Sequence, residues 1–99
     1  MIAVLGSFRF PTDALAEARP LMRAVIAATR AEPGCRDYAY AEDIAEPGLF
    51  RVTELWDSRD ALTAHFATPH MEAWVEQRKA LGFFDRRISV HELGAGEAL

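Results

Sequence analysis

Two histidines five positions apart, His65 and His70, are the side chains in this sequence best suited to proton transfer. Imidazole titrates near neutral pH, so it can act as a base or a donor toward a bound hydroxyl group. His65 falls on the apolar side of a predicted helix, where packing against a last-turn carbonyl is an equally good interpretation. His70 falls in the first turn of the next predicted helix, where the dipole disfavours a second positive charge. Simple helix-end packing is the competing interpretation for His70. Both are candidate catalytic residues.

Aromatic side chains near these histidines form the predicted wall of a small-molecule pocket. Trp56 and Trp74 are large enough to fill a hydrophobic core, or to stack against an aromatic ligand. Phe66 follows His65 on the same helix. Tyr38 and Tyr40 share one face of a predicted strand and would present their hydroxyls to a pocket or to an interface. We expect these five residues to bind a substrate.

Glu54 is an acidic residue between apolar ones, on the same strand face as Val52 and Trp56. A carboxylate in such surroundings is either neutralised by a salt bridge or has a raised pKa. We expect the salt bridge, possible partners for which are Arg9, Arg51, Arg86 and Arg87. Glu54 joins the candidate substrate-binding residues.

A metal centre is not expected from the sequence. The spacing between the two histidines is interrupted by Pro69, and no third ligand shares an obvious face with them. Metal sites need three or four converging groups. The single Cys35 is interpreted as a small apolar residue at a strand start, with a reactive thiol as the alternative. Phosphate-binding, dinucleotide-binding and serine-hydrolase motifs are absent.

The bulk composition predicts one soluble domain in the cytoplasm. A chain of 99 residues with 51% hydrophobic residues suits a single core. No apolar run is long enough for a transmembrane helix, and the first ten residues lack a signal-peptide pattern. Lys79 is the only lysine and the net charge is −4. A nucleic-acid partner is therefore not expected, because such binding depends on clustered positive charge.

Alternating and helical patterns divide the chain into six main elements. Thr12 is the expected helix cap after the first strand, and Pro20 should kink that first helix rather than break it. Asp57–Ser58 and Thr68–Pro69 are the expected starts of the later helices. The expected order is a strand at 2–10, a helix to about 31, strands at 35–43 and 49–56, a helix from 58 that restarts at 68, and a strand at 83–93.

This strand–helix–strand–strand–helix–strand order predicts an α+β fold, the ferredoxin-like βαββαβ sandwich. The helices would cover one face of a four-stranded antiparallel sheet. Both faces of at least two strands carry apolar residues, so the second face needs a partner. We expect a homodimer built sheet against sheet. Residues 94–99 have no core-forming pattern and are expected to form a loose tail after a single domain at 1–93.

Three segments, EPGCRDYAY, FRVTELWDS and ALTAHFATPHMEAW, together resemble the antibiotic biosynthesis monooxygenase (ABM) family. The quinol-monooxygenase-like members are the most similar, since many carry an A-H-x-x-T-P-H segment like the one at residues 64–70. The resemblance covers about residues 1–93 and implies a dimeric α+β barrel with a small apolar pocket in each subunit. It implies no single reaction, because the family contains cofactor-free oxygenases, haem-degrading oxygenases and isomerases.

The departures from the family patterns narrow the choice. The haem-degrading branch has an asparagine early in its first strand and a Trp–His pair ten residues apart. This sequence has Gly6 and Ser7 in that strand, and Val75 ten residues after His65. The polyketide branch pairs the strand tryptophan with an asparagine and a tyrosine, whose positions hold Val52 and Leu62. Haem degradation is therefore disfavoured, and the substrate-binding set of the polyketide branch is incomplete.

The resemblance and the histidines together favour a monooxygenase that oxidises a small aromatic or quinol-type substrate with O₂, without a metal or any other cofactor. His65 or His70 would be its base. A proton-transfer isomerase of a small polar metabolite is the first alternative. Inward-pointing arginines would favour it. A small-molecule-binding module without chemistry is the second alternative.

Overall fold

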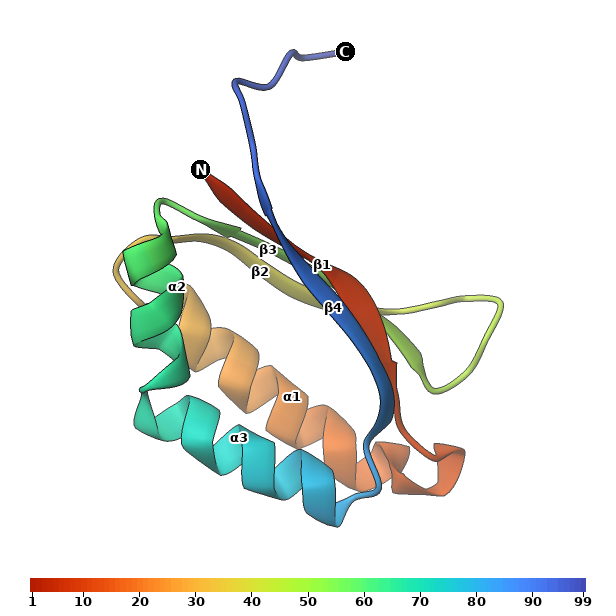
Figure 1. Cartoon of the computed structure of the whole chain (residues 1–99). Coiled ribbons are helices and arrows are strands. Elements are labelled where there is room, and N and C mark those ends of the chain that lie inside the picture. Colours follow the sequence, from red (N-terminus) through yellow and green to blue (C-terminus); the bar gives the residue numbers. More distant parts are fainter.

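The computed structural model describes all 99 residues and has two layers (Figure 1). Three helices lie against one face of a four-stranded antiparallel sheet, and no helix covers the other face. The elements are β1 (Ile2–Arg9), the short 3₁₀ helix η1 (Thr12–Ala14), α1 (Leu15–Arg30), β2 (Cys35–Glu42), β3 (Leu49–Trp56), α2 (Arg59–Phe66), α3 (Pro69–Ala80) and β4 (Phe84–Glu92).

The sheet order is β2-β3-β1-β4, so β1 is an inner strand, as its two apolar faces predict. Val4 of β1 lies opposite Glu54 of β3 on one side and Val90 of β4 on the other. Because side chains alternate along a strand, these residues share the face that the helices cover. The predicted α+β ferredoxin-like fold is confirmed.

The helix starts follow local capping chemistry in two cases of three. The Ser58 and Thr68 side chains accept hydrogen bonds from the backbone N–H groups of Ala61 and Met71, as predicted. The Thr12 cap is wrong, because Thr12 opens the 3₁₀ turn and α1 begins only at Leu15, without a side-chain cap. Pro20 lies inside α1, which continues through it as one helix.

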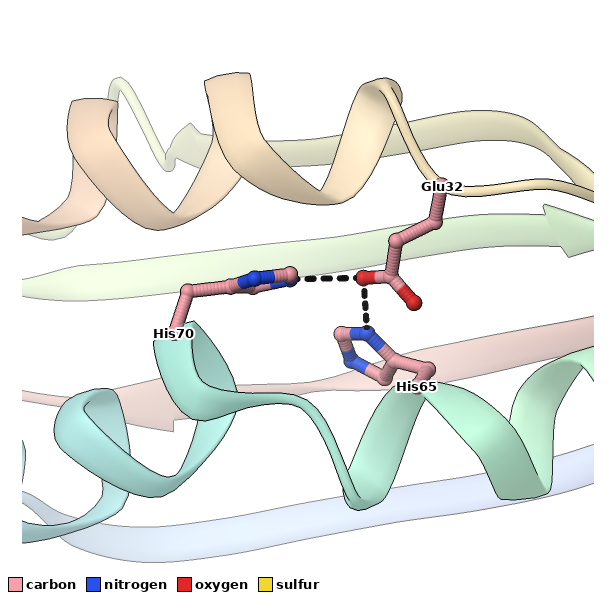
Figure 2. A group of neighbouring side chains, drawn as sticks. All are labelled: Glu32, His65 and His70. Carbon is pink, nitrogen blue, oxygen red and sulfur yellow. Dashed lines mark hydrogen bonds and ion pairs between the residues drawn. The ribbon is translucent and has the colours of Figure 1, made fainter.

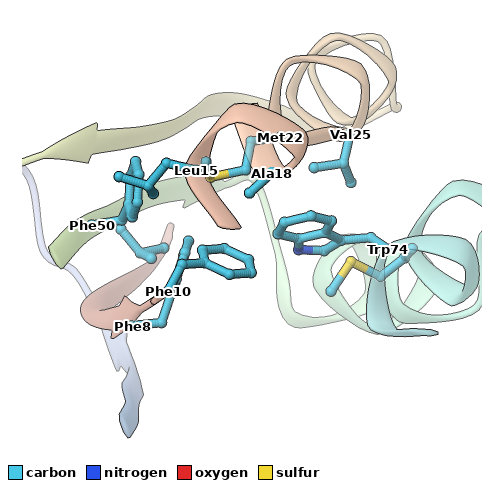
Figure 3. Packing of buried hydrophobic residues seen from close by; sticks show 10 residues of the cluster. Phe8, Phe10, Leu15, Ala18, Met22, Val25, Phe50 and Trp74 are labelled. Carbon is cyan, nitrogen blue, oxygen red and sulfur yellow. The ribbon is translucent and has the colours of Figure 1, made fainter. Parts of the chain in front are cut away.

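The main core lies between α1, α3 and the β1–β3 half of the sheet (Figure 3). Phe8 stacks on Phe50 and meets Phe10 edge to face, while Trp74 closes the core from α3. A smaller core around Trp56 packs under α2. Both tryptophans are completely buried. This packing holds α2 and α3 at a fixed height above the sheet.

The uncovered face of the sheet is partly apolar. Leu5, in the middle of β1, is 44% exposed there, although it belongs to an inner strand. Residues 93–99 form no helix or strand and are exposed. None of the three helices has the length and apolar character needed to cross a membrane.

Candidate functional site

A cavity of about 150 Å³ lies between the helical layer and the sheet. Ten of its 15 lining residues are hydrophobic, so it can hold an apolar ring while a few polar groups orient it. The lining comprises Val4, Phe8, Tyr38, Tyr40, Val52, Glu54, Leu62, His65, Phe66, Met71, Arg78, Arg86, Ile88, Ser89 and Val90.

His65, in the last turn of α2, lines this cavity. The side chain is 1% exposed, and its Nδ1 lies 2.7 Å from Oε2 of Glu32. Carboxylates only accept hydrogen bonds, so Nδ1 is the donor, and in the neutral imidazole Nε2 then holds the lone pair. Nε2 makes no hydrogen bond within the protein and lies on the side of the ring away from Glu32 (Figure 2). It is the nitrogen available to a molecule in the cavity.

The turn after α1 places Glu32 beside α2. Glu32 donates its backbone N–H to Thr29 at 2.9 Å, and Gly34 accepts from the backbone of Asp57 at 2.8 Å. Gly34 has φ +83, and a Cβ there would lie 2.6 Å from the Cβ of Ala61 in α2. The glycine therefore serves twice, since it supplies the left-handed turn and permits the close approach.

His70 holds the same carboxylate from α3. Its Nε2 also lies 2.7 Å from Oε2 of Glu32, so one oxygen accepts hydrogen bonds from two imidazoles (Figure 2). The His70 side chain is 26% exposed and does not line the cavity. Of the two predicted catalytic histidines, only His65 faces the cavity. His70 is linked to His65 through the Glu32 carboxylate.

Glu54 lines the cavity and makes no ion pair within the chain, so the expected salt bridge is wrong for a single chain; a bridge across a dimer stays a prediction. Of the four suggested arginines, Arg9, Arg51 and Arg87 pair with other carboxylates. Arg86 lies more than 4 Å from the Glu54 carboxylate. Trp56 Nε1 donates to Glu54 Oε1 at 3.0 Å. Burial raises the pKa of Glu54 to about 7, against the lowering effects of the Trp56 hydrogen bond and Arg86.

Tyr38 and Tyr40 present a hydrogen-bonded pair of hydroxyls to the cavity. Their oxygens lie 2.5 Å apart. Burial raises the pKa of both hydroxyls, that of Tyr40 to about 12, so both stay protonated at neutral pH. One of the two protons is shared within the pair. The other is free to be donated to a substrate oxygen.

The other predicted binding residues are divided by their position. Phe66 lines the cavity beside His65. Trp56 and Trp74 do not line it, because both lie wholly within the cores behind its wall. Trp56 still contacts the site, since its ring centroid lies 4.9 Å from that of His65.

Three polar residues of the site were not expected from the sequence: Glu32, Arg78 and Arg86. No sequence pattern singled out Glu32 or Arg78, and Arg86 was considered only as a possible partner of Glu54. Neither arginine pairs with a carboxylate of the chain. Arg78 lies 4.6 Å over the Phe83 ring, and burial, with the nearby charge of Arg86, lowers its pKa.

Comparison with known proteins agrees with this architecture. The family model described as antibiotic biosynthesis monooxygenase matches residues 1–77. The chain belongs to this family. The uncharacterised protein sll1783 of Synechocystis is 32% identical over 99% of this chain and 67% of its own length.

Two solved structures superpose over nearly the whole chain. A protein from Deinococcus radiodurans, described as a putative antibiotic biosynthesis monooxygenase, is 31% identical with a TM-score of 0.93, over 100% of this chain and 98% of its own. Rv0793 of Mycobacterium tuberculosis, named a putative monooxygenase, is 31% identical with a TM-score of 0.86, over 98% of each chain. The family and its fold are thus established, and monooxygenase activity is supported at family level.

Proposed function

We propose that this ABM protein is a cofactor-independent monooxygenase of a small aromatic, quinol-type substrate. The observation that carries the proposal is the His65 ring. Its Nε2 lone pair is open to an apolar cavity, while Glu32 holds the opposite nitrogen. A carboxylate behind an imidazole fixes its tautomer and stabilises the imidazolium that forms when it accepts a proton.

The cavity volume restricts the substrate. A dry cavity of about 150 Å³ is enough to hold benzene in another protein, and this cavity is of that size. A single hydroxylated ring therefore fits, whereas a fused polycyclic one requires the cavity to open. The Tyr38–Tyr40 pair can donate a hydrogen bond to one ring oxygen as His65 takes the proton of the other.

The proposed reaction begins with transfer of a phenolic proton to Nε2 of His65. The phenolate is rich in electrons at its ring carbon, and that carbon forms a bond with O₂, which gives a peroxide after proton return from His65. The O–O bond then breaks with loss of water and leaves a carbonyl. For a hydroquinone the balance is substrate plus O₂ to hydroxyquinone plus water. The substrate supplies all four electrons.

The test is oxygen uptake with 1,4-hydroquinone under excess chelator, with the enzyme free of flavin. We expect turnover by the wild type and a fall of roughly 10²–10⁴-fold in kcat for His65→Gln, the range for loss of a general base. His91→Ala, which removes the exposed third histidine, is the matched control. Uptake that requires added iron or flavin refutes the cofactor-free mechanism. Equal kcat for His65→Gln and the wild type refutes the role of His65.

A second function is favoured by Arg78 and Arg86, which line the cavity without carboxylate partners. They would hold an anionic group, as expected for a proton-transfer isomerase of a small polar metabolite. In D₂O, an isomerase should exchange the α-proton of its substrate for deuterium, and the NMR signal of that proton should disappear. Exchange by the wild type that is lost in Arg78→Met would support this reaction. Hydroquinone oxidation unaffected by Arg78→Met would assign the arginines no part in the oxidation.

A homodimer through the uncovered sheet face is part of the same proposal. That face has no helix over it and exposes Leu5. A second copy would bury it. Sedimentation should give a dimer for the wild type and a larger monomer fraction for Leu5→Glu. A monomeric wild type at assay concentrations would refute this.

A further inference from the structure

We propose that Glu32, His65 and His70 form a binding site for a divalent cation of the Zn²⁺ type. The site lies behind the cavity and goes beyond the proposed oxidation, which needs no metal. Two imidazoles and one carboxylate, completed by water, are a ligand set that Zn²⁺ takes in proteins. Figure 2 shows both imidazoles directed at one oxygen of Glu32.

The three ligands come from three different segments of the fold. Glu32 follows α1, His65 is in the last turn of α2 and His70 is in the first turn of α3. One donor atom from each lies within 4.8 Å of the others. Convergence from positions 33 and 38 residues apart requires the whole helical layer to be in place. The site is therefore assembled by tertiary packing, as metal sites are.

The three ligands must shift to hold a metal ion. Ligands at about 2.0–2.2 Å around a tetrahedral ion lie roughly 3.3 Å apart. The two histidine nitrogens can be as much as 4.8 Å apart and must approach each other. Each now lies 2.7 Å from Glu32 Oε2, so the carboxylate must also retreat by about half an ångström. Glu32 can make this movement because its side chain projects from a turn and not from the packed core.

Charge and access also favour a cation. Glu32 has no arginine or lysine within 4 Å, and its hydrogen-bond partners are the two histidines. Its side chain is only 10% exposed, so its negative charge is poorly screened by water. The His70 side chain is 26% exposed, so one of the three ligands is in contact with solvent.

Metal binding would change the group that Nε2 of His65 presents to the cavity. Without metal, Nδ1 carries the proton and the Nε2 lone pair faces the cavity. A cation on Nδ1 needs that lone pair instead, so the proton moves to Nε2, which becomes a donor. The base is then lost without net release of a proton. Zn²⁺ should therefore inhibit the oxidation instead of supporting it.

The binding experiment uses the metal-stripped full chain and needs no turnover. Calorimetry with Zn²⁺ should give one ion per chain, and Co²⁺ should give the visible absorption of a tetrahedral site with nitrogen ligands. His70→Ala and Glu32→Gln should weaken Zn²⁺ binding by at least roughly 100-fold, beyond what loss of an outer partner causes. His91→Ala is the matched control, since it removes a histidine outside the site, and it should bind as the wild type does.

Two results would overturn the metal site. One is the absence of stoichiometric Zn²⁺ binding at micromolar concentration. The other is Zn²⁺ binding that survives in both His70→Ala and Glu32→Gln. Circular dichroism shows whether each variant is folded, and the partly exposed His70 is the safer substitution. Because binding is read without substrate, failure here leaves the oxidation proposal standing. Failure of hydroquinone turnover likewise leaves the Zn²⁺ result interpretable.

Discussion

The buried carboxyl group of Glu54 makes the stability of this protein depend on pH in a calculable way. Its side chain is 7% exposed and its pKa is about 7, against 4.5 for an ordinary glutamate. The protonated form is favoured by folding. The contribution of Glu54 to the free energy of unfolding is fully present below about pH 4.5 and is lost as the pH rises through 7. A difference of about 2.5 pKa units corresponds to a loss on the order of 3 kcal/mol.

Glu54→Gln isolates this contribution, because glutamine has the shape of the protonated acid and still accepts the Trp56 hydrogen bond. The neighbouring charges are Arg86, which opposes the pKa rise, and Glu32, which adds to it. Both are present in the wild type and the variant. The variant should match the wild type near pH 4.5 and exceed it at pH 8.5 by on the order of 3 kcal/mol, a rise of roughly 10–20 °C in Tm.

Urea denaturation of both proteins between pH 4.5 and 8.5 measures the difference directly. Glu76→Gln is the matched control, since Glu76 is exposed on α3 and has no ion pair. Its stability relative to the wild type should not vary with pH by more than a few tenths of a kcal/mol. A difference between Glu54→Gln and wild type that is the same at all pH values would refute the raised pKa.

Two further substitutions test how the backbone positions the site. Gly34→Ala should lower the free energy of unfolding, measured in urea, by about 1–3 kcal/mol, because its φ of +83 disfavours a side chain and Ala61 occupies the space. Gly82→Ala is the control, since Gly82 also has φ +83 but only Pro11 lies nearby, and it should lower the free energy of unfolding by less. Ser58→Ala should lower stability by about 1 kcal/mol in thermal or urea unfolding, through loss of the cap on Ala61 N–H. A loss within a few tenths of a kcal/mol, as for an ordinary surface substitution, would show that the cap is not used.

The sequence predicts the fold well because its signals are local and mutually consistent. Period-two patterns define the strands, and Ser58 and Thr68 mark helix starts through side chains that bond only three residues ahead. Thr12 carries the same kind of signal but lies in a 3₁₀ turn, so its hydroxyl caps nothing. Local capping propensity does not reveal whether a turn precedes the helix.

The site is less predictable because it depends on contacts between distant residues. Glu32 reaches His65 and His70 only after the chain has folded, and a glutamate before Pro33–Gly34 is also an ordinary helix end. The orientation of Arg78 toward the cavity depends on how α3 is rotated above the sheet. For Glu54, the sequence leaves both a salt bridge and a raised pKa open. Only the position of the arginines decides between them.

Glu54 and His65 are rival bases, since both line the cavity and an acid of pKa about 7 can also accept a proton near neutral pH. The surrounding bonds distinguish them. One Glu54 oxygen is occupied by Trp56, and no cation holds the carboxylate once it is ionised. His65 has a carboxylate behind it that stabilises its charged form, so proton uptake is assisted where it occurs. A hydroquinone oxidation abolished by His65→Gln but retained by Glu54→Gln follows from this asymmetry, and the reverse pattern would make Glu54 the base.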